Sequence, residues 1–302
     1  MLVSQFQVLL YYKYVDIDDP EKLKEDQMYL CESLNLKARI IVSKEGINGT
    51  LEGKTLDTER YIQAMRKINF FKDMVFKKSA GTGSAFPKLS IKVRPEIIAL
   101  GVPNLSPNKI SGKYIDADKL HSWFEDKKEF YIIDMRNDYE YLSGYFENSI
   151  FSNTHNFFDL PKALPRLVHL KDKTVVTVCT GGVRCEKASG FLLMNGFNDV
   201  YQLKDGIQTY MEKYPNKHFK GKLYVFDNRL TLGFNTEDKE HEIVGRCMKC
   251  NKVCDSYVNC AYNFCHFHYI SCEECLDRQL NLPFCDTVCK EKYLQQLSSS
   301  LN

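Results

Sequence analysis

The segment TVVTVCTGGVRCEKASGFLLMNG, residues 174–196, decides how the centre of this chain folds. Its first five residues are all β-branched and three of them are valine, which is typical of a buried strand. Gly181 and Gly182 let the backbone turn tightly, and a helix is expected to begin near Arg184. Cys179 stands where the strand ends. The segment therefore predicts a parallel α/β unit that carries a cysteine at the carboxyl end of a strand.

Further short apolar strands are expected on both sides of this segment, with amphipathic helices between them. They are FYIID (130–134), SIFSN (149–153) and DVYQL (199–203). This rhythm predicts a central parallel α/β domain over residues 112–222.

The predicted surroundings of Cys179 favour a thiolate. Backbone N–H groups of the loop residues are expected to converge on the sulfur, and the helix dipole and the Arg184 guanidinium favour its anion. Such surroundings lower a cysteine pKa from about 8.5 to roughly 3.5–7.5. The alternative is an inert, packed cysteine, which would need neither the glycine pair nor Arg184. The expected active-site loop is Thr180, Gly181, Gly182, Val183 and Cys185.

Cys185 itself allows two interpretations. It can form a disulfide with Cys179 and so resolve a persulfide, or it can pack as a small residue under the helix.

Together with IIDMRNDYEYLSGYFENSI (132–150) and GFNDVYQLKDGIQTY (196–210), the cysteine segment resembles the signature segments of a rhodanese domain. The resemblance implies a persulfide-bearing cysteine at Cys179. It also matches Asp134 and Arg136 to an acidic–basic pair that organises the loop, and Glu140 to the carboxylate that follows. We expect the catalytic set to be Cys179, Arg184, Asp134 and Arg136. The loop is one residue shorter than a phosphatase loop of this architecture, which favours sulfur chemistry over dephosphorylation.

The first hundred residues predict a separate domain. FQVLLYYKYV (6–15) is expected as a strand, residues 20–36 and Thr58–Ile68 as helices, and MVFKKS and LSIKVR as further strands. ARIIVS and EGINGTLEG predict a hairpin with its turn at Asn48-Gly49. The resulting β-α-β-β-α-β order predicts a ferredoxin-like α+β domain over residues 1–100, followed by a linker at about 101–111.

Residues 66–94 contain eight Lys or Arg residues and one acidic residue, Asp73. A solvated face is the ordinary explanation for such a run, and contact with RNA is the alternative. For RNA we expect phosphate contacts from Lys88, Lys92 and Arg94, with Phe86 stacked on an unpaired base.

Nine of the 12 cysteines lie between Cys247 and Cys289, which predicts metal binding over residues 240–302. Two CxxC pairs predict a structural Zn²⁺ on Cys247, Cys250, Cys272 and Cys275. A second Zn²⁺ is expected on four of Cys254, Cys260, Cys265, His266, Cys285 and Cys289. Reduced cysteines packed against the central domain are the alternative.

Taken in order, VSKEGINGT, FPKLSIKVRPEIIALG, the rhodanese segments and the cysteine block resemble the bacterial tRNA uridine hydroxylase family over nearly the whole chain. That resemblance implies oxygen-dependent conversion of uridine 34 in tRNA to 5-hydroxyuridine. The family pattern differs at Gly144-Tyr145 and Asp205-Gly206, and neither pair is expected to contact the cysteine loop.

Two other functions remain open at this stage. One is a sulfurtransferase that takes sulfur from a donor protein or small thiol and passes it to a thiol or a tRNA-thiolation acceptor, and the other is a regulatory module that binds a partner. Neither a nucleotide-binding fingerprint nor a two-His-one-carboxylate triad is evident.

The overall composition predicts a globular cytoplasmic protein. The net charge is +2, 44% of residues are hydrophobic, and no apolar run approaches the roughly 20 residues of a membrane span. The opening residues carry no export-signal pattern.

Overall fold

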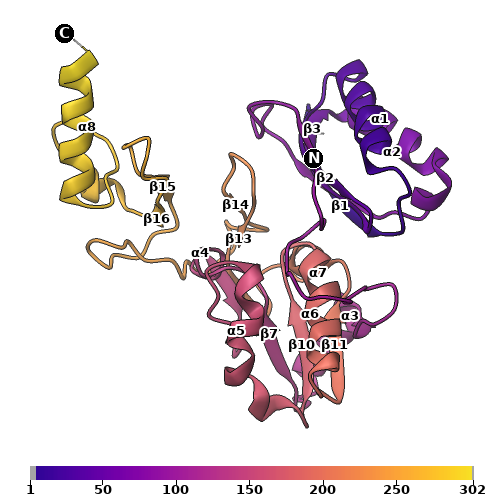
Figure 1. The fold of residues 1–302 in the computed structure, drawn as a ribbon. Coiled ribbons are helices and arrows are strands. Elements are labelled where there is room, and N and C mark those ends of the chain that lie inside the picture. The colour runs from indigo at the N-terminus through magenta and orange to yellow at the C-terminus, as the bar shows by residue number, and fades with distance from the viewer. Residues whose placement is uncertain (1–4, 301–302) are drawn as a thin grey trace.

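The computed structural model describes residues 5–300, with side chains described for residues 5–298. Three parts follow one another along the chain: an α+β domain, a parallel α/β domain and a cysteine-rich segment (Figure 1). None of the helices within residues 5–300 combines the length and the apolar composition that crossing a bilayer requires.

The N-terminal part contains, among the described residues, a five-stranded sheet in the order β4-β1-β3-β2-β5. Its elements are β1 (Phe6–Tyr14), α1 (Pro20–Ser33), β2 (Lys37–Ser43), β3 (Gly46–Lys54), α2 (Thr55–Lys67), β4 (Phe76–Ala80) and β5 (Ser90–Val93). The first four strands of this order are antiparallel neighbours, and β5 adds to β2 in parallel. The expected ferredoxin-like arrangement is confirmed.

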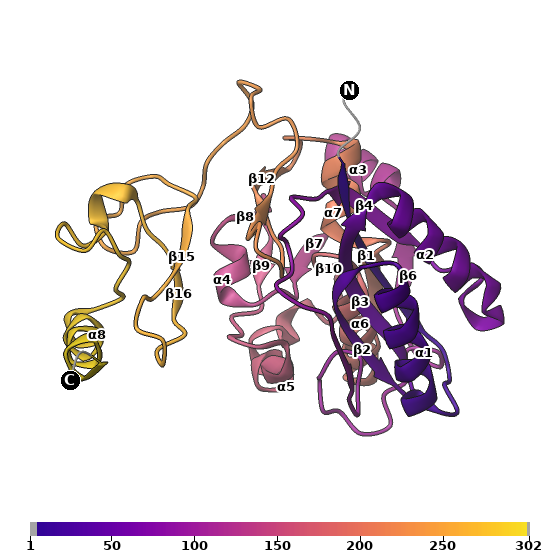
Figure 2. The same ribbon diagram turned by 90° about the horizontal axis from the view of Figure 1, so that it is seen from above.

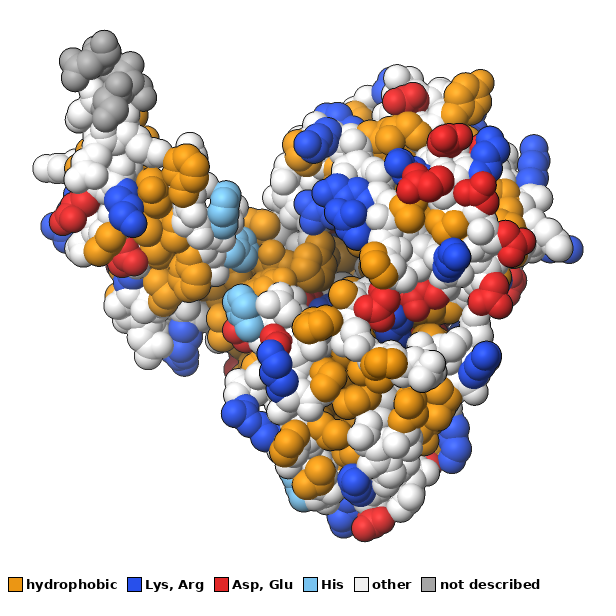
Figure 3. All heavy atoms as spheres, in the orientation of Figure 1, with side chains coloured by type: hydrophobic (Ala, Val, Ile, Leu, Met, Phe, Trp, Pro, Cys, Tyr) orange, Lys and Arg blue, Asp and Glu red, His pale blue; other side chains and the backbone are white. Residues whose placement is uncertain are grey.

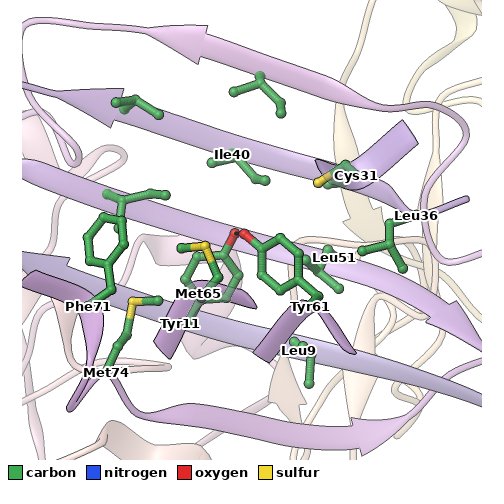
Figure 4. Close-up of a cluster of buried hydrophobic side chains, with 14 of the residues drawn as sticks. Leu9, Tyr11, Cys31, Leu36, Ile40, Leu51, Tyr61, Met65, Phe71 and Met74 are labelled. Atoms are coloured by element: carbon green, nitrogen blue, oxygen red, sulfur yellow. Dashed lines mark hydrogen bonds between the residues drawn. The ribbon is translucent and has the colours of Figure 1, made fainter. Parts of the chain in front are cut away.

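The two faces of this sheet have different roles, because side chains alternate along each strand. Leu9, Tyr11 and Ile40 belong to a core that α1 and α2 cover (Figures 2 and 4). Within that core the Tyr11 and Tyr61 hydroxyls form a hydrogen bond of 2.5 Å (Figure 4). The residues that alternate with these core residues along the strands, such as Leu10 and Tyr12, point away from the helices. This second face of the sheet is available for contact with another part of the protein.

The hairpin turn lies at a different place from the one expected. β2 and β3 pair from Ser43↔Gly46 onward, so the turn is at residues 44–45. Asn48 and Gly49 lie inside β3, where Gly49 pairs with Tyr11 of β1. A Cβ atom at Gly49 would lie 2.5 Å from the Tyr11 ring, so this glycine makes room for an aromatic side chain. Pairing with β1 therefore overrides the local Asn-Gly turn preference.

The central part is a parallel sheet in the order β6-β11-β10-β7-β9 within the described residues, which confirms the α/β prediction. Its elements are β6 (Lys113–Ile115), α3 (Ala117–Glu125), β7 (Tyr131–Asp134), α4 (Asp138–Tyr141), β8 (Gly144–Phe146), β9 (Ile150–Phe151), α5 (Leu160–Ala163), β10 (Thr174–Val178), α6 (Val183–Met194), β11 (Asp199–Leu203) and α7 (Gly206–Lys213). Both faces of the sheet are covered, so two apolar clusters flank β10 and β11.

The cysteine-rich part contains short strands and one terminal helix. They are β12 (Phe219–Gly221), β13 (Leu223–Tyr224), β14 (Thr231–Leu232), β15 (Tyr257–Asn259), β16 (His268–Ile270) and α8 (Thr287–Ser300). β12 pairs with β8 of the central part. β13 lies against α4 and β8 of the central part, whereas the region that carries β15, β16 and α8 extends away from the central sheet (Figure 1).

Candidate active site

Cys179 follows β10 directly and precedes the turn into α6. The Gly182 N–H group donates to Cys179 Sγ at 3.1 Å. Gly182 has a φ of +104°, a conformation that favours glycine, and it is the last residue before α6. The loop therefore places a helix start and a backbone donor at the sulfur.

The free face of the N-terminal sheet covers this loop. A Cβ atom at Gly181 would lie 2.8 Å from Leu10, and one at Gly182 would lie 2.7 Å from the Tyr12 hydroxyl. The glycine pair thus has a second purpose, which is to let strand β1 approach the cysteine loop closely.

A cavity of about 570 Å³, here called the cysteine cavity, lies between the two domains. Cys179 lines it although the side chain is fully buried. The cavity is also lined by Tyr12, Arg39, Asn48, Asn156, Phe158 and Phe226. A thiol at the wall of a cavity of this size can meet a small molecule or a single base.

Arg184 is held by a buried network. Its guanidinium binds the Glu140 carboxylate through both terminal nitrogens, Nη1 to Oε1 and Nη2 to Oε2 at 2.8 Å, and Nη2 also donates to Thr180 Oγ1 at 3.2 Å. Glu140 is fully buried and the Arg184 side chain is 6% exposed. The charge of Arg184 therefore lies beside the loop in a fixed position, and Glu140, matched only by resemblance, is what fixes it.

Asp134 and Arg136 form a second buried ion pair, at the end of β7. Arg136 Nη2 donates to Asp134 Oδ2 at 2.6 Å and to the Gly144 carbonyl at 2.7 Å. Neither residue is among those lining the cysteine cavity within the described chain. This geometry assigns them a positioning role, which ties β7 to the start of β8.

The surroundings of Cys179 lower its pKa. Burial alone would raise it, but hydrogen bonds from Cys185 and from the Gly182 amide, together with the Arg184 charge, bring the pKa of Cys179 to about 6. Burial and the neighbouring Cys179 sulfur raise the pKa of Cys185 well above its usual range. The pair therefore consists of one thiolate and one thiol at neutral pH.

The expectation that Asp205-Gly206 does not contact the loop is wrong. The Ile207 N–H group donates to the Cys179 carbonyl at 2.9 Å, and a Cβ atom at Gly206 would lie 2.7 Å from Gly181. Asp205 also pairs with buried Lys77 of the N-terminal domain at 3.4 Å. Because α7 begins against the loop, a change at this dipeptide reaches Cys179. Gly144 acts less directly, through Arg136.

The cysteines of the C-terminal segment form two groups in which the four sulfur atoms lie within 4.8 Å of one another. One group is Cys247, Cys250, Cys272 and Cys275, and the other is Cys260, Cys265, Cys285 and Cys289. The structure thus selects four of the six residues expected for the second group. Cys254 packs in an apolar cluster, and His266 lines a groove instead.

The distances between the sulfur atoms fit tetrahedral coordination of one metal ion in each group. The Cys250–Cys272 and Cys265–Cys285 separations are both 3.6 Å, and Cys285–Cys289 is 3.5 Å. A tetrahedron with metal–sulfur bonds of about 2.3 Å has edges of about 3.8 Å, whereas a disulfide bond measures about 2.05 Å. Each group can therefore hold a metal.

The cations of the basic stretch, residues 66–94, have different environments, since some are buried or ion-paired and others are exposed. Lys77 is buried against Asp205, and Lys78 pairs with Glu59. Lys88, Lys92 and Arg94 are exposed, and Lys92 pairs in register with Ile41, a residue of the cysteine cavity. The prediction for Phe86 is wrong: it is 2% exposed and packs with Val8 and Ala85, so it is not free to stack on a base.

Sequence reasoning missed the Asn48 side chain, which was assigned to a turn. Its Nδ2 donates to the Ile97 carbonyl at 3.1 Å, so its orientation is fixed at the cysteine cavity. The alternation of β3 could have found it, since Asn48 pairs with Tyr12 on the same sheet face.

The statement that no set of two histidines and one carboxylate is evident is also corrected: the ligand atoms of His121, Glu125 and His218 lie within 4.8 Å of one another. His218 Nε2 lies 2.9 Å from Glu125 Oε1. The spacing of His121 and Glu125 on one helix face was the available signal. The cysteine cavity, as lined by described residues, includes none of the three, so the cluster is separate from the Cys179 site.

A buried reactive-cysteine loop on a parallel α/β domain, covered by an α+β domain and followed by a cysteine-rich segment, defines a multidomain protein of the rhodanese class. Family models agree: residues 6–97 match the UPF0176 acylphosphatase like domain, residues 116–213 the Rhodanese-like domain and residues 220–290 the Rhodanase C-terminal family. The chain belongs to the tRNA uridine(34) hydroxylase family.

The relatives that establish the family extend over most of the chain. The chain is 44% identical over 273 residues to the tRNA uridine(34) hydroxylase of Staphylococcus aureus strain Newman, covering 89% of this chain and 85% of that protein. The protein of the same name from strain bovine RF122 / ET3-1 is 43% identical with the same coverage. Among solved structures, a rhodanese-like domain protein from Staphylococcus aureus is 27% identical, covers 32% of this chain and 90% of that chain, and has a TM-score of 0.28.

Proposed function

We propose that this protein is an oxidoreductase that uses dioxygen to hydroxylate uridine 34 of tRNA to 5-hydroxyuridine at Cys179. The observation that carries the proposal is a cysteine with a pKa of about 6 at the wall of a cavity between two domains. Membership of the tRNA uridine(34) hydroxylase family supports tRNA as the substrate.

The proposed reaction begins with covalent addition. The Cys179 thiolate adds to C6 of the uracil ring, and the electron pair of the C5–C6 double bond moves onto the C4 carbonyl. The resulting enolate is nucleophilic at C5. Addition thus turns an unreactive ring carbon into one that can take up oxygen.

Oxygen transfer requires two electrons from a thiol reductant. One atom of dioxygen becomes bonded to C5, and the other leaves as water when two thiols supply two electrons and two protons and become a disulfide. Loss of the C5 proton then expels the Cys179 thiolate and restores the double bond. The thiolate is regenerated, so the cysteine acts catalytically.

The loop residues have distinct proposed roles. The backbone amides of Gly182 and Cys185 and the charge of Arg184 keep Cys179 ionised before addition and after expulsion, and Gly181 and Val183 complete the turn that carries these groups. Thr180 links the loop to the Glu140–Arg184 pair. Cys185 donates to the thiolate, and Asp134 and Arg136 act as positioning residues.

We further propose that the two cysteine groups each bind a structural Zn²⁺. A four-thiolate donor set and separations near the tetrahedral edge support zinc. The ion would supply folding free energy to a segment that has only small apolar clusters.

Lys88, Lys92 and Arg94 are proposed phosphate contacts, because they are exposed beside the sheet face that lines the cavity. Binding to tRNA should then weaken strongly between about 50 and 200 mM salt. Binding that is unchanged over this range would contradict these contacts.

A persulfide sulfurtransferase is the second candidate function. It is favoured by the loop, in which a backbone amide and Arg184 surround a single sulfur atom. In that case a donor protein or small thiol would load Cys179.

Nucleoside analysis of tRNA separates the two functions. Cells lacking the protein are compared with cells that regain the wild-type protein, a Cys179→Ser variant or a Cys254→Ser control, whose thiol lies outside both cysteine groups. Hydroxylation is supported if cells lacking the protein lose 5-hydroxyuridine-derived nucleosides, and if the wild-type protein and Cys254→Ser restore them but Cys179→Ser does not. Loss of a thiolated nucleoside instead supports sulfur transfer.

The addition step has its own test. Active enzyme is trapped with substrate RNA, and the mixture is searched by mass spectrometry for a uridine joined to the Cys179 peptide. Repeated absence of that species with active enzyme would count against addition at C6.

A further inference from the structure

A second hollow lies between the cysteine-rich segment and the other two domains. We call it the C-terminal groove. Its volume is about 960 Å³, and its walls include Arg39, Arg246, Lys249, Phe226 and Phe267. Figure 3 shows this hollow between the cysteine-rich segment at upper left and the body of the molecule, with hydrophobic and histidine side chains along it.

The C-terminal groove and the cysteine cavity adjoin each other. Arg39 of β2 and Phe226 line both of them. A chain molecule lying in the groove can therefore place one of its units into the cavity beside Cys179 while its neighbours stay in the groove.

The charge of the groove suits a polyanion. Arg39, Arg246 and Lys249 form no ion pair within the described part of the chain. The acidic residues of the lining are already paired: Asp138 lies 3.0 Å from His155, and Asp227 lies 2.6 Å from Arg229. Arg39, Arg246 and Lys249 therefore give the groove three cations that are free to meet phosphates.

Aromatic side chains in the groove are exposed to an unusual degree. Phe226 is 41% exposed and Phe267 is 45% exposed. Flat apolar rings beside unpaired cations are the combination by which proteins hold single-stranded nucleic acid, because bases stack on the rings while phosphates meet the cations. An acidic peptide would use the cations but would leave the rings in water.

We propose that the C-terminal groove binds the single-stranded anticodon loop, with base 34 turned into the cysteine cavity and neighbouring nucleotides stacked on Phe226 and Phe267. The inference rests on the proposed tRNA substrate. It gives the cysteine-rich segment a role, since that segment becomes one wall of the RNA site.

The cysteine groups hold that wall in place. Arg246 and Lys249 flank Cys247 of the first group, and His266 and Phe267 follow Cys265 of the second group directly. Each group thus fixes a short turn whose next residues face the groove. Loss of either group is expected to disorder the RNA contacts while the Gly182 contact to Cys179 persists.

The test measures binding separately from chemistry. Full-length Cys179→Ser protein is titrated against a fluorescent anticodon stem-loop with uridine 34, so that binding is read without turnover. Phe267→Ala and Lys249→Ala are compared with Phe264→Ala and Lys252→Ala, which alter residues of the same segment outside the groove. Zinc content and thermal unfolding verify that each variant is folded.

We expect Phe267→Ala to raise the dissociation constant at least about fivefold, as loss of one stacked base implies. Lys249→Ala should lower the slope of log affinity against log salt by about one. Both control variants should bind like the parent. The proposal would be overturned if both groove variants bound the stem-loop like the parent, or if the control variants weakened binding equally. It would also be overturned if polyglutamate displaced the RNA equally well from the parent and from Phe267→Ala.

The failure of this inference can be told apart from failure of the proposed function. If the groove variants bind normally and wild-type protein still makes 5-hydroxyuridine, only the groove assignment is wrong. If the stem-loop binds through the groove but no hydroxylated nucleoside forms, the reaction assignment is wrong and the groove stands.

Discussion

The Tyr12 hydroxyl donates to the Glu186 carboxylate at 3.1 Å, which links the N-terminal sheet to the helix that follows the cysteine loop. Glu186 also accepts from Tyr114 at 2.8 Å. A second link lies nearby, where Lys187 binds Glu45 at 2.8 Å and Glu96 at 2.6 Å. These contacts make the cover over Cys179 a fixed part of the site.

Replacing Tyr12 with Phe tests that link. Tyr12→Phe keeps the ring against Gly182 but removes the hydrogen bond to Glu186, so the free energy of unfolding should fall by about 1 kcal/mol. Urea unfolding measures the change. Tyr29→Phe is the control because the Tyr29 side chain is 78% exposed, and it should have no effect. Equal stability of both variants would mean that the link contributes nothing.

The reactivity of Cys179 should depend on pH with a midpoint near 6. Only the thiolate is alkylated, and its pKa of about 6 leaves it ionised at neutral pH and protonated as the pH falls below that value. Iodoacetamide labelling at a series of pH values, quantified on the Cys179 peptide by mass spectrometry, gives the midpoint. Cys31, whose pKa burial raises to about 12, is the internal control and should stay unlabelled near neutral pH.

Cys185 is the side chain expected to move that midpoint. Cys185→Ala removes its hydrogen bond to the thiolate, so the pKa of Cys179 should rise and the midpoint should shift to higher pH. Cys185→Ser keeps a donor and should shift it less. A wild-type midpoint above pH 8, or an identical midpoint in all three proteins, would contradict this account of the thiolate.

What the sequence predicted and what it missed have different physical origins. The Cys179 loop and the two CxxC pairs are set by residues close together in the chain, so local spacing was enough to find them. The turn was misplaced because Asn48-Gly49 has a strong local preference that pairing with β1 overrides. The contacts between the domains could not be predicted from local patterns, because Leu10 and Tyr12 lie over the loop only when the two domains pack together.

The second metal group illustrates the same limit. Six residues had suitable chemistry for the second metal site, and their spacing in the sequence did not determine which four of them bind the metal. The β15–β16 hairpin and the start of α8 bring Cys260, Cys265, Cys285 and Cys289 together, whereas Cys254 packs with Tyr224 and Tyr257.

Metal analysis can distinguish these groups. Protein purified without chelator should contain about two zinc ions per chain, one for each four-thiolate group. Cys250→Ser and Cys289→Ser should each lower the content by about one, because each removes a ligand from a different group. Cys254→Ser should leave it unchanged. Less than about half an equivalent of zinc in the wild-type protein would contradict zinc at both groups.

Gly206 should be essential for the shape of the cysteine loop. It has a φ of +74°, and a Cβ atom there would lie 2.7 Å from Gly181 Cα and from the Thr180 carbonyl, which are backbone atoms that cannot yield without moving the loop. Because a displacement of about 1 Å at a reacting group can lower a rate by about 100-fold, Gly206→Ala should reduce formation of 5-hydroxyuridine by about that factor.

Gly196→Ala is the matched control: its φ is +83°, but its nearest neighbour is Lys171 Nζ at 3.6 Å. That control should lose about 1–2 kcal/mol of stability to backbone strain and keep its activity. If both variants retained activity, or lost it equally, contact between α7 and the loop would not govern the position of Cys179.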